Sequence, residues 1–124
     1  MKDSTFRNYR FEDLEVWKIG MQIIHGVYGI VKKFPREELF ALADQLKRAA
    51  TSIVLNIAEG SGQPTSKGFA VYLNRSKSSV LECAACAKIA LQEGFVLEKD
   101  VRVLNDYLQM EYFNLIALEK SIRK

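Results

Sequence analysis

A row of polar side chains runs through the helical stretch QLKRAATSIVLNIAEG at residues 45–60. Its members are separated by steps of three or four residues, which place them on one face of a helix. They are Gln45, Arg48, Ser52, Asn56 and Glu59. Three interpretations are open: a solvated face, a buried structural network, or a cleft in which Arg48 and Gln45 bind an anionic group.

We expect the buried network. The row lies one position away from the apolar residues Leu46 and Ile53, so it should border the core. The third helical segment offers serines and a glutamate at similar spacing, and Glu111 interrupts the apolar row of the fourth. A carboxylate beside a core needs a partner, so we expect Arg48 to pair with Glu82, Glu59 or Glu111. Arg48→Ala should then cost about 3–5 kcal/mol. The predicted network that fixes helix register comprises Gln45, Arg48, Ser52, Asn56, Glu59, Glu82 and Glu111, with Ser76 and Ser79 nearby.

Other chemistry finds little support in the sequence. A di-metal bundle site needs Glu-x-x-His pairs, but the chain has one histidine, His25, preceded three residues earlier by Gln22. Cys83-Ala-Ala-Cys86 is a lone pair inside a helical pattern, whereas structural zinc needs four ligands. No glycine-rich phosphate-binding loop is present. We therefore expect no metal site, no cofactor and no enzymatic activity.

Four amphipathic segments must position these residues. The first runs from about residue 12 to 33, and the second begins with Pro35 in its first turn and ends near Gly60 or Gly62. The third should begin after Thr65 or Ser66 and end at Gly94, and the fourth should begin near residue 98. No strand pattern competes. We predict an all-α protein with one domain, residues 1–124, folded as an antiparallel up-down-up-down four-helix bundle behind an N-terminal arm, residues 1–11.

The first and last helices carry more apolar residues than one core requires. In the first, we expect one row to face the core, namely Leu14, Trp17, Met21, Ile24, Tyr28 and Val31. A second row remains, namely Val16, Ile19, Ile23, Val27 and Ile30. In the fourth helix the second row is Val103, Tyr107, Met110, Phe113 and Ile116. Two apolar faces on two helices predict that copies of the chain pack together.

The charge balance is mildly basic, with a net charge of +3 among 124 residues and a pI near 8.9. Such a balance weakly favours an anionic partner. Candidate contacts to nucleic acid are Arg7, Arg10, Lys18, Lys67, Lys77 and Lys88. Phe6, Tyr9 and Phe11 alternate with the N-terminal arginines, and they could stack on bases or attach the arm to a neighbouring subunit. No run is long enough for a membrane span, and two free thiols favour the cytoplasm.

Several short motifs carry a resemblance to a known family. The most specific is Asn56-Ile-Ala-Glu-Gly60. The others are Phe11-Glu-Asp-Leu14 with Val16-Trp17, Phe34-Pro35-x-x-Glu38, Gln45-Leu-Lys-Arg48-Ala-Ala-x-Ser52, and Tyr72-Leu73 leading to Ser79-x-x-Glu82. Over about residues 9–95 the chain resembles the bacterial large-subunit rRNA intervening-sequence proteins. It departs from their pattern at Gln63, where a basic residue is usual, and at Ala84, where a second glutamate is frequent.

This resemblance implies an antiparallel four-helix bundle that forms ring-like homo-oligomers, pentamers among them. It also implies association with nucleic acid, because a similar bundle serves retroelements as an accessory protein that binds reverse transcriptase and nucleic acid. The leading hypothesis is a non-enzymatic homo-oligomer, a pentamer by preference, that binds RNA, DNA or an enzyme acting on them. The alternative is a protein-binding structural module with no affinity for nucleic acid.

Overall fold

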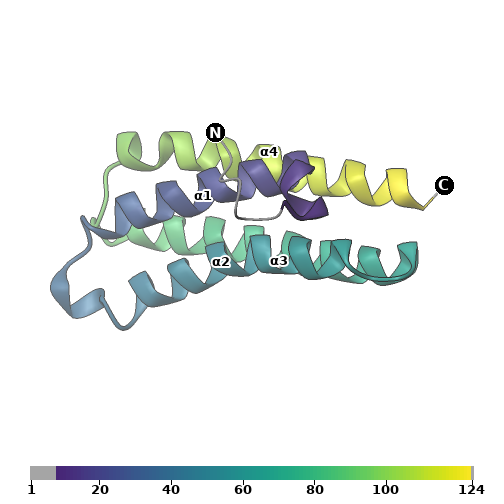
Figure 1. The fold of residues 1–124 in the computed structure, drawn as a ribbon. Coiled ribbons are helices and arrows are strands. Elements are labelled where there is room, and N and C mark those ends of the chain that lie inside the picture. The colour runs from purple at the N-terminus through teal and green to yellow at the C-terminus, as the bar shows by residue number, and fades with distance from the viewer. Residues whose placement is uncertain (1–7, 124) are drawn as a thin grey trace.

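The computed structural model describes residues 8–123, which form four long helices packed side by side (Figure 1). The helices are α1, Glu15–Val31; α2, Leu42–Ser61; α3, Ser66–Gln92; and α4, Glu98–Ile122. Short 3-10 helices, Arg10–Asp13 and Arg36–Glu38, precede α1 and α2. Successive long helices run in opposite directions, and residues 8–123 contain no strand. The predicted all-α antiparallel bundle is confirmed, while most of the predicted arm lies outside the described residues.

The ends of α3 follow the local signals in the sequence. At the start, the side chain of Thr65 accepts a hydrogen bond from the backbone N–H of Gly68 at 3.0 Å. At the end, Gly94 has a φ of +76°, a conformation that glycine adopts without steric cost. The backbone N–H groups of Gly94 and Phe95 then donate to the carbonyls of Leu91 and Ala90. This arrangement is a Schellman motif, and the expected end of the third helix is confirmed.

The start of α2 differs from the prediction. Pro35 does not open this helix; it precedes the 3-10 helix Arg36–Glu38, and α2 begins only at Leu42. The backbone of Ala41, with φ −122° and ψ −105°, breaks the helical path between them. As a result the side chain of Phe40 is 95% exposed. An apolar residue that looked like part of a helix therefore stands on the surface of the α1–α2 connection.

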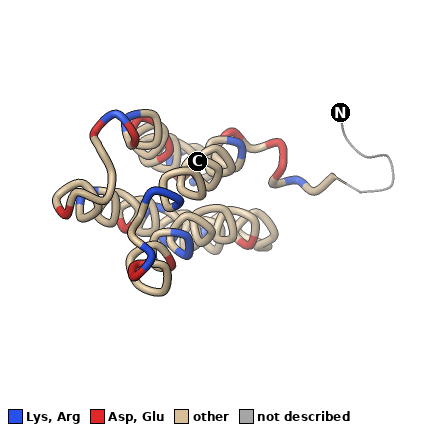
Figure 2. Tube along the Cα trace, turned by 90° about the vertical axis from the view of Figure 1, so that its left-hand side faces the viewer, with Lys and Arg blue, Asp and Glu red and all other residues tan. Residues whose placement is uncertain are grey.

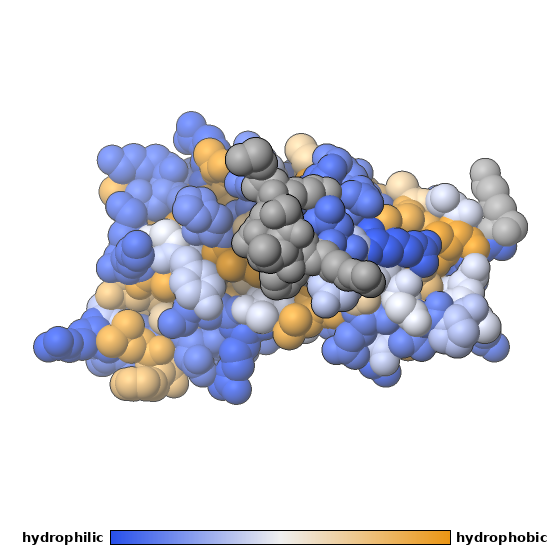
Figure 3. Space-filling view, in the orientation of Figure 1, coloured by the Kyte–Doolittle hydropathy of each residue, from blue (hydrophilic) through white to orange (hydrophobic). Residues whose placement is uncertain are grey.

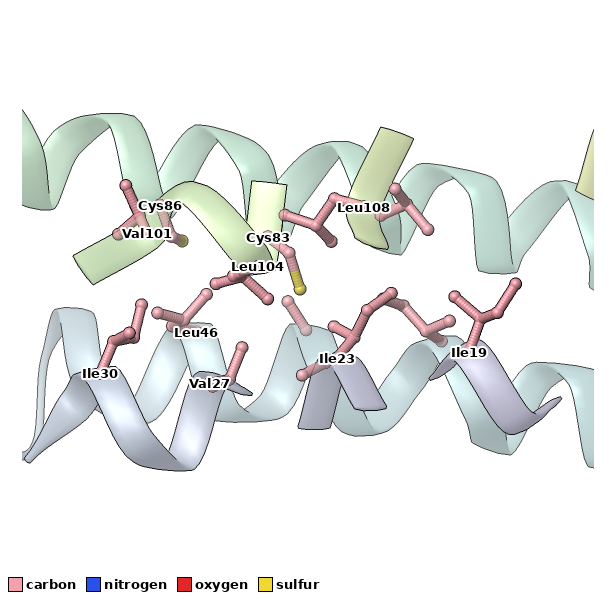
Figure 4. Close-up of a cluster of buried hydrophobic side chains, with 14 of the residues drawn as sticks. Ile19, Ile23, Val27, Ile30, Leu46, Cys83, Cys86, Val101, Leu104 and Leu108 are labelled. Carbon is pink, nitrogen blue, oxygen red and sulfur yellow. The ribbon is translucent and has the colours of Figure 1, made fainter. Parts of the chain in front are cut away.

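The face of α1 that enters the core is the row that we expected to face outward. Val16, Ile19, Ile23, Val27 and Ile30 are all at most 5% exposed. Figure 4 shows the last four of them pointing toward side chains of the other three helices. Both rows have helical spacing, so periodicity alone does not distinguish them. The inward row is made of compact β-branched residues, which suit the close approach of neighbouring helices.

The core row of α4 is as expected from the sequence. Val101, Leu104, Leu108 and Leu115 are at most 5% exposed, and Leu104 and Leu108 point into the core in Figure 4. Glu111 lies in the same row and is also fully buried. The bundle therefore encloses one carboxyl group among leucines, isoleucines and valines.

Candidate functional site

The polar row of α2 borders an open groove between α2 and α3. This groove has a volume of about 820 Å³, and its walls include Gln45, Arg48 and Ser52 from α2 and Glu82 from α3. Gln45, Arg48 and Glu82 are exposed to solvent. The groove is therefore a surface feature, and the predicted row does not enclose a cavity. Glu59, the last member of the row, is exposed near the other end of α2.

Arg48 does not pair with any of the three glutamates expected. Its Nη2 atom lies 2.8 Å from Oδ2 of Asp44, one turn earlier on the same helix, and 79% of its side chain is exposed. A pair spaced by four residues needs no rearrangement of the bundle and remains in water, where it contributes little to stability. The predicted pairing with Glu59, Glu82 or Glu111 is wrong, and Asp44 is the residue that the sequence-based prediction missed.

Two serine hydroxyls of α3 make short polar contacts to α2, and an asparagine of α2 supports one of these contacts. Asn56 Nδ2 donates to the backbone oxygen and to Oγ of Ser52, at 2.8 and 3.0 Å. Ser79 Oγ donates to Ser52 Oγ at 2.9 Å, and Ser76 Oγ donates to the carbonyl of Ile53 at 2.8 Å. Ser76 is fully buried, so its hydroxyl links the two helices inside the core.

A third, longer contact between α2 and α3 crosses the groove. Gln45 Nε2 donates to Glu82 Oε2 at 3.4 Å, near the limit for a hydrogen bond. Both side chains are exposed, so water competes for this contact. The predicted polar network thus divides into a partly buried serine–asparagine cluster, a solvated pair, and residues that lie apart from both.

Glu111 is the most unusual of the predicted site residues. Its side chain is 0% exposed, and neither carboxyl oxygen has a hydrogen-bond partner among residues 8–123. Burial, and secondarily the charge of Glu15, raises the pKa of Glu111 to about 9. The carboxyl group is therefore protonated and neutral at pH 7. Glu111 is thus neutralised by a bound proton, and it lacks the cationic partner that we expected.

The two cysteine thiols are also buried, and burial raises their pKa values. Burial, with smaller contributions from Cys86 and Glu82, raises the pKa of Cys83 to about 12. Burial also raises the pKa of the Cys86 thiol. A thiol reacts through its thiolate, so neither cysteine is activated as a nucleophile. Across the described part of the chain, no group of three or more His, Cys, Asp and Glu side chains could hold a metal ion.

The basic residues proposed to contact nucleic acid are spread over the bundle. Arg7 lies outside the described residues. Arg10 Nη1 donates to the carbonyl of Ser61 at 3.0 Å, and its guanidinium lies 5.8 Å from the centre of the Phe69 ring. Its role here is to hold the N-terminal segment against the end of α2. Lys18 on α1 and Lys67 and Lys88 on α3 are exposed, and Lys77 on α3 is half-buried.

The aromatic residues of the N-terminal segment pack against one another and against α1. The rings of Tyr9 and Phe11 are stacked at 5.5 Å, and the Phe11 ring lies 4.4 Å from that of Trp17. Phe6 lies outside the described residues. The sequence-based prediction missed a basic–aromatic pair on α3, in which the Arg75 guanidinium lies 4.8 Å from the Tyr72 ring. Figure 2 shows positive and negative residues interleaved along the helices.

Comparison with known families decides what kind of protein has this geometry. The family model of the 23S rRNA-intervening sequence protein matches residues 12–112, which include α1, α2, α3 and most of α4. The chain belongs to this family. The match extends beyond the region that carried the resemblance in the sequence and includes Glu111. No curated protein matches this intervening-sequence protein in a sequence search.

The surface of this intervening-sequence protein carries two apolar rows. On α1, Met21 and Tyr28 are 43% and 48% exposed. On α4, Val103, Met110 and Phe113 are 65%, 48% and 66% exposed. The α1 row borders α2, since Tyr28 shares a shallow groove with Thr51 and Leu55 and lies 5.7 Å from Lys47 Nζ. Among residues 8–123, no helix has the length and apolar character required to cross a membrane.

Proposed function

We propose that this intervening-sequence protein is a non-enzymatic homo-oligomer that acts in the cytoplasm as an accessory or scaffold protein on nucleic acid. The observation that carries the proposal is the pair of exposed apolar rows on α1 and α4, in a chain of a family described by its link to 23S rRNA.

The two apolar rows support assembly. They differ in residues and belong to different helices, so a contact between them joins unlike surfaces of two copies. Contacts of this head-to-tail kind close into rings when the rotation between copies is suitable. A row of two to three exposed apolar side chains on each partner provides the apolar centre of such a contact. The resemblance to the family favours five copies in the ring.

Charge supports the association with nucleic acid. A net charge of +3 per chain becomes +15 for five copies, so symmetry turns a weak field into a substantial one. Lys18, Lys67 and Lys88 are exposed, and Lys77 shares the face of α3 that carries Lys88. Contacts of lysine with phosphate depend on salt but not on sequence, which fits a scaffold better than a sequence-specific binder.

The assembly is tested by light scattering on the purified protein. We expect a mass several times that of the 14.1 kDa chain, and a smaller mass for Met110→Lys, because a charge would be buried in the contact. Asn105→Lys, an exposed position on the same helix, serves as the control. A monomeric wild-type protein would refute the homo-oligomer.

Binding of nucleic acid is tested separately by fluorescence anisotropy with labelled RNA and duplex DNA. We expect micromolar or tighter binding at about 50 mM salt that weakens steeply at about 200 mM. The double variant Lys77→Ala/Lys88→Ala should bind more weakly, whereas Lys32→Ala, an exposed lysine at the end of α1, should not. No binding to either probe at low salt would rule out this part of the proposal.

A second candidate function is a protein-binding module with no affinity for nucleic acid. The observation that favours it is the acidic character of the α2–α3 groove, where Glu38, Glu82 and Glu93 line the walls. Phosphate groups would be repelled from this surface. The labelled RNA and duplex DNA distinguish the two functions, since a protein-binding module without affinity for nucleic acid binds neither probe even at low salt, where phosphate contacts are strongest.

A further inference from the structure

We propose that the groove between α2 and α3 binds a basic segment of a protein partner. Two connections of the bundle border the groove: Phe40 comes from the α1–α2 connection and Phe95 from the α3–α4 connection. This site is separate from the two apolar rows and from the lysines considered above. The inference rests on the second candidate function and deepens it, because it names the partner as a basic segment of a protein.

The groove combines an apolar floor with an exposed aromatic side chain. Leu42 and Ala49 from α2 and Ile89 from α3 line it, and Ile89 is 48% exposed. Phe40 stands 95% exposed at its edge. Figure 3 shows hydrophobic surface over the α1–α2 connection, bordered by hydrophilic residues. An apolar side chain of a partner would therefore find a matching surface here.

Charge selects the kind of partner. Three carboxylates, Glu38, Glu82 and Glu93, line the groove. Among residues 8–123, the one cation on its walls is Arg48, which is already paired with Asp44 at 2.8 Å. Gln45 makes only a long hydrogen bond to Glu82, so that carboxylate is available to a stronger donor. A segment containing lysine or arginine complements this set, and its cation could also lie over the Phe40 ring.

The dimensions of the groove fit a short segment. The walls extend along α2 from Leu42 to Ser52 and along α3 from Glu82 to Glu93. At 1.5 Å per residue, each wall is roughly 15 Å long. One face of a helix of about ten residues, with one or two apolar side chains inward and basic side chains at the rim, occupies that length.

The test uses two labelled twelve-residue amphipathic peptides that share the same leucines and differ only in charge. One carries lysine and arginine at the polar positions, and the other carries glutamate. Fluorescence anisotropy with the full-length protein should show binding of the basic peptide, at least tenfold tighter than the acidic one and weaker at 200 than at 50 mM salt. Glu82→Lys/Glu93→Lys and Phe40→Ala should each weaken it at least tenfold.

The control variants are Asp106→Lys and Leu81→Ala, which change an exposed charge and an exposed apolar side chain outside the groove. Both should bind the basic peptide as the wild-type protein does. Equal binding of the two peptides, no binding of the basic peptide at 100 µM, or unchanged affinity in the groove variants would overturn the proposal. So would loss of oligomeric mass or of RNA binding in Phe40→Ala, because the occupant would then be a second copy or RNA.

Discussion

Gly20 of α1 lies directly against the carboxyl group of Glu111 of α4. A Cβ atom at position 20 would stand 3.1 Å from Oε2 of Glu111 and 2.5 Å from Cγ1 of Val54 on α2. The absence of a side chain at this position thus makes room for a carboxyl group where three helices meet. The glycine on α1 therefore leaves the space that the buried, protonated carboxyl group on α4 occupies.

Gly20→Ala should therefore destabilise the protein. The added methyl group has to displace Val54, and overpacking of this kind costs about 1–3 kcal/mol, offset in part by the better helix propensity of alanine. Gly29→Ala is the matched control, because a Cβ there meets nothing within 4 Å and should stabilise α1 by about 0.5–1 kcal/mol. Urea denaturation measures both. Equal effects of the two substitutions would contradict the close approach at Gly20.

Because of Glu111, the free energy of unfolding should fall as the pH rises into the alkaline range. Its pKa is raised from 4.5 in the unfolded chain to about 9 in the folded protein. Below pH 4.5 the group is protonated in both states and carries no penalty. As the pH rises toward 9, only the unfolded chain releases the proton, so the free energy of unfolding falls, on the order of 6 kcal/mol in total.

Glu111→Gln should remove this dependence, because an amide does not titrate. Denaturation curves should be measured at pH 5, 7 and 9. As the pH rises, the free energy of unfolding of the variant should increase relative to that of the wild-type protein. Glu59→Gln, an exposed position, should leave the wild-type dependence in place. Parallel pH profiles for the wild-type protein and Glu111→Gln would show that Glu111 is ionised in the folded protein.

Arg48→Ala should change the free energy of unfolding by less than about 1 kcal/mol, because the ion pair with Asp44 is exposed. Ser76→Ala should cost about 1 kcal/mol, since it removes a fully buried hydrogen bond to the carbonyl of Ile53. Ser78→Ala, at an exposed position on the same helix, is the control. If Arg48→Ala lowered the free energy of unfolding by about 3–5 kcal/mol, the result would contradict the exposed pair and support the buried pairing predicted from the sequence.

The thiols should be unreactive in the folded protein. Cys83 and Cys86 are buried, and burial raises both pKa values. At pH 8 a disulfide reagent such as DTNB should label neither, and in guanidinium chloride it should label both. Ser121→Cys provides an exposed thiol on α4 that should react at once in the folded protein. Rapid labelling of two thiols in the native wild-type protein would disagree with the packing of α3.

The helix ends were predictable where a short-range interaction sets them. Thr65 and Gly94 act within four residues of their own positions, so their roles are visible in the sequence. The inward face of α1 was not predictable, because two rows share the same spacing and only the neighbouring helices decide between them. The late start of α2 was missed for a related reason: no residue type near Ala41 marks the break.

The candidate site was predictable only in part. The position of Glu111 in a core row was evident from the leucines around it, but its lack of a partner depends on the positions of α1 and α2. For Arg48 the nearest acid in the sequence, Asp44, was the partner, and a long-range pairing was preferred in error. Groove shape depends on side chains from two connections and two helices, which no local pattern encodes.

The short connection between α2 and α3 has a consequence for the order in which the bundle assembles. Only residues 62–65 separate these helices, they pack more extensively than any other pair, and Gly60 lies against Phe69 and Tyr72 beside the turn. Closing so small a loop costs little entropy. We therefore expect the α2–α3 hairpin to form early in folding, with φ-values near 1 around the turn. The α1–α4 contact joins the most distant parts of the sequence and should form last, on the way down from the transition state.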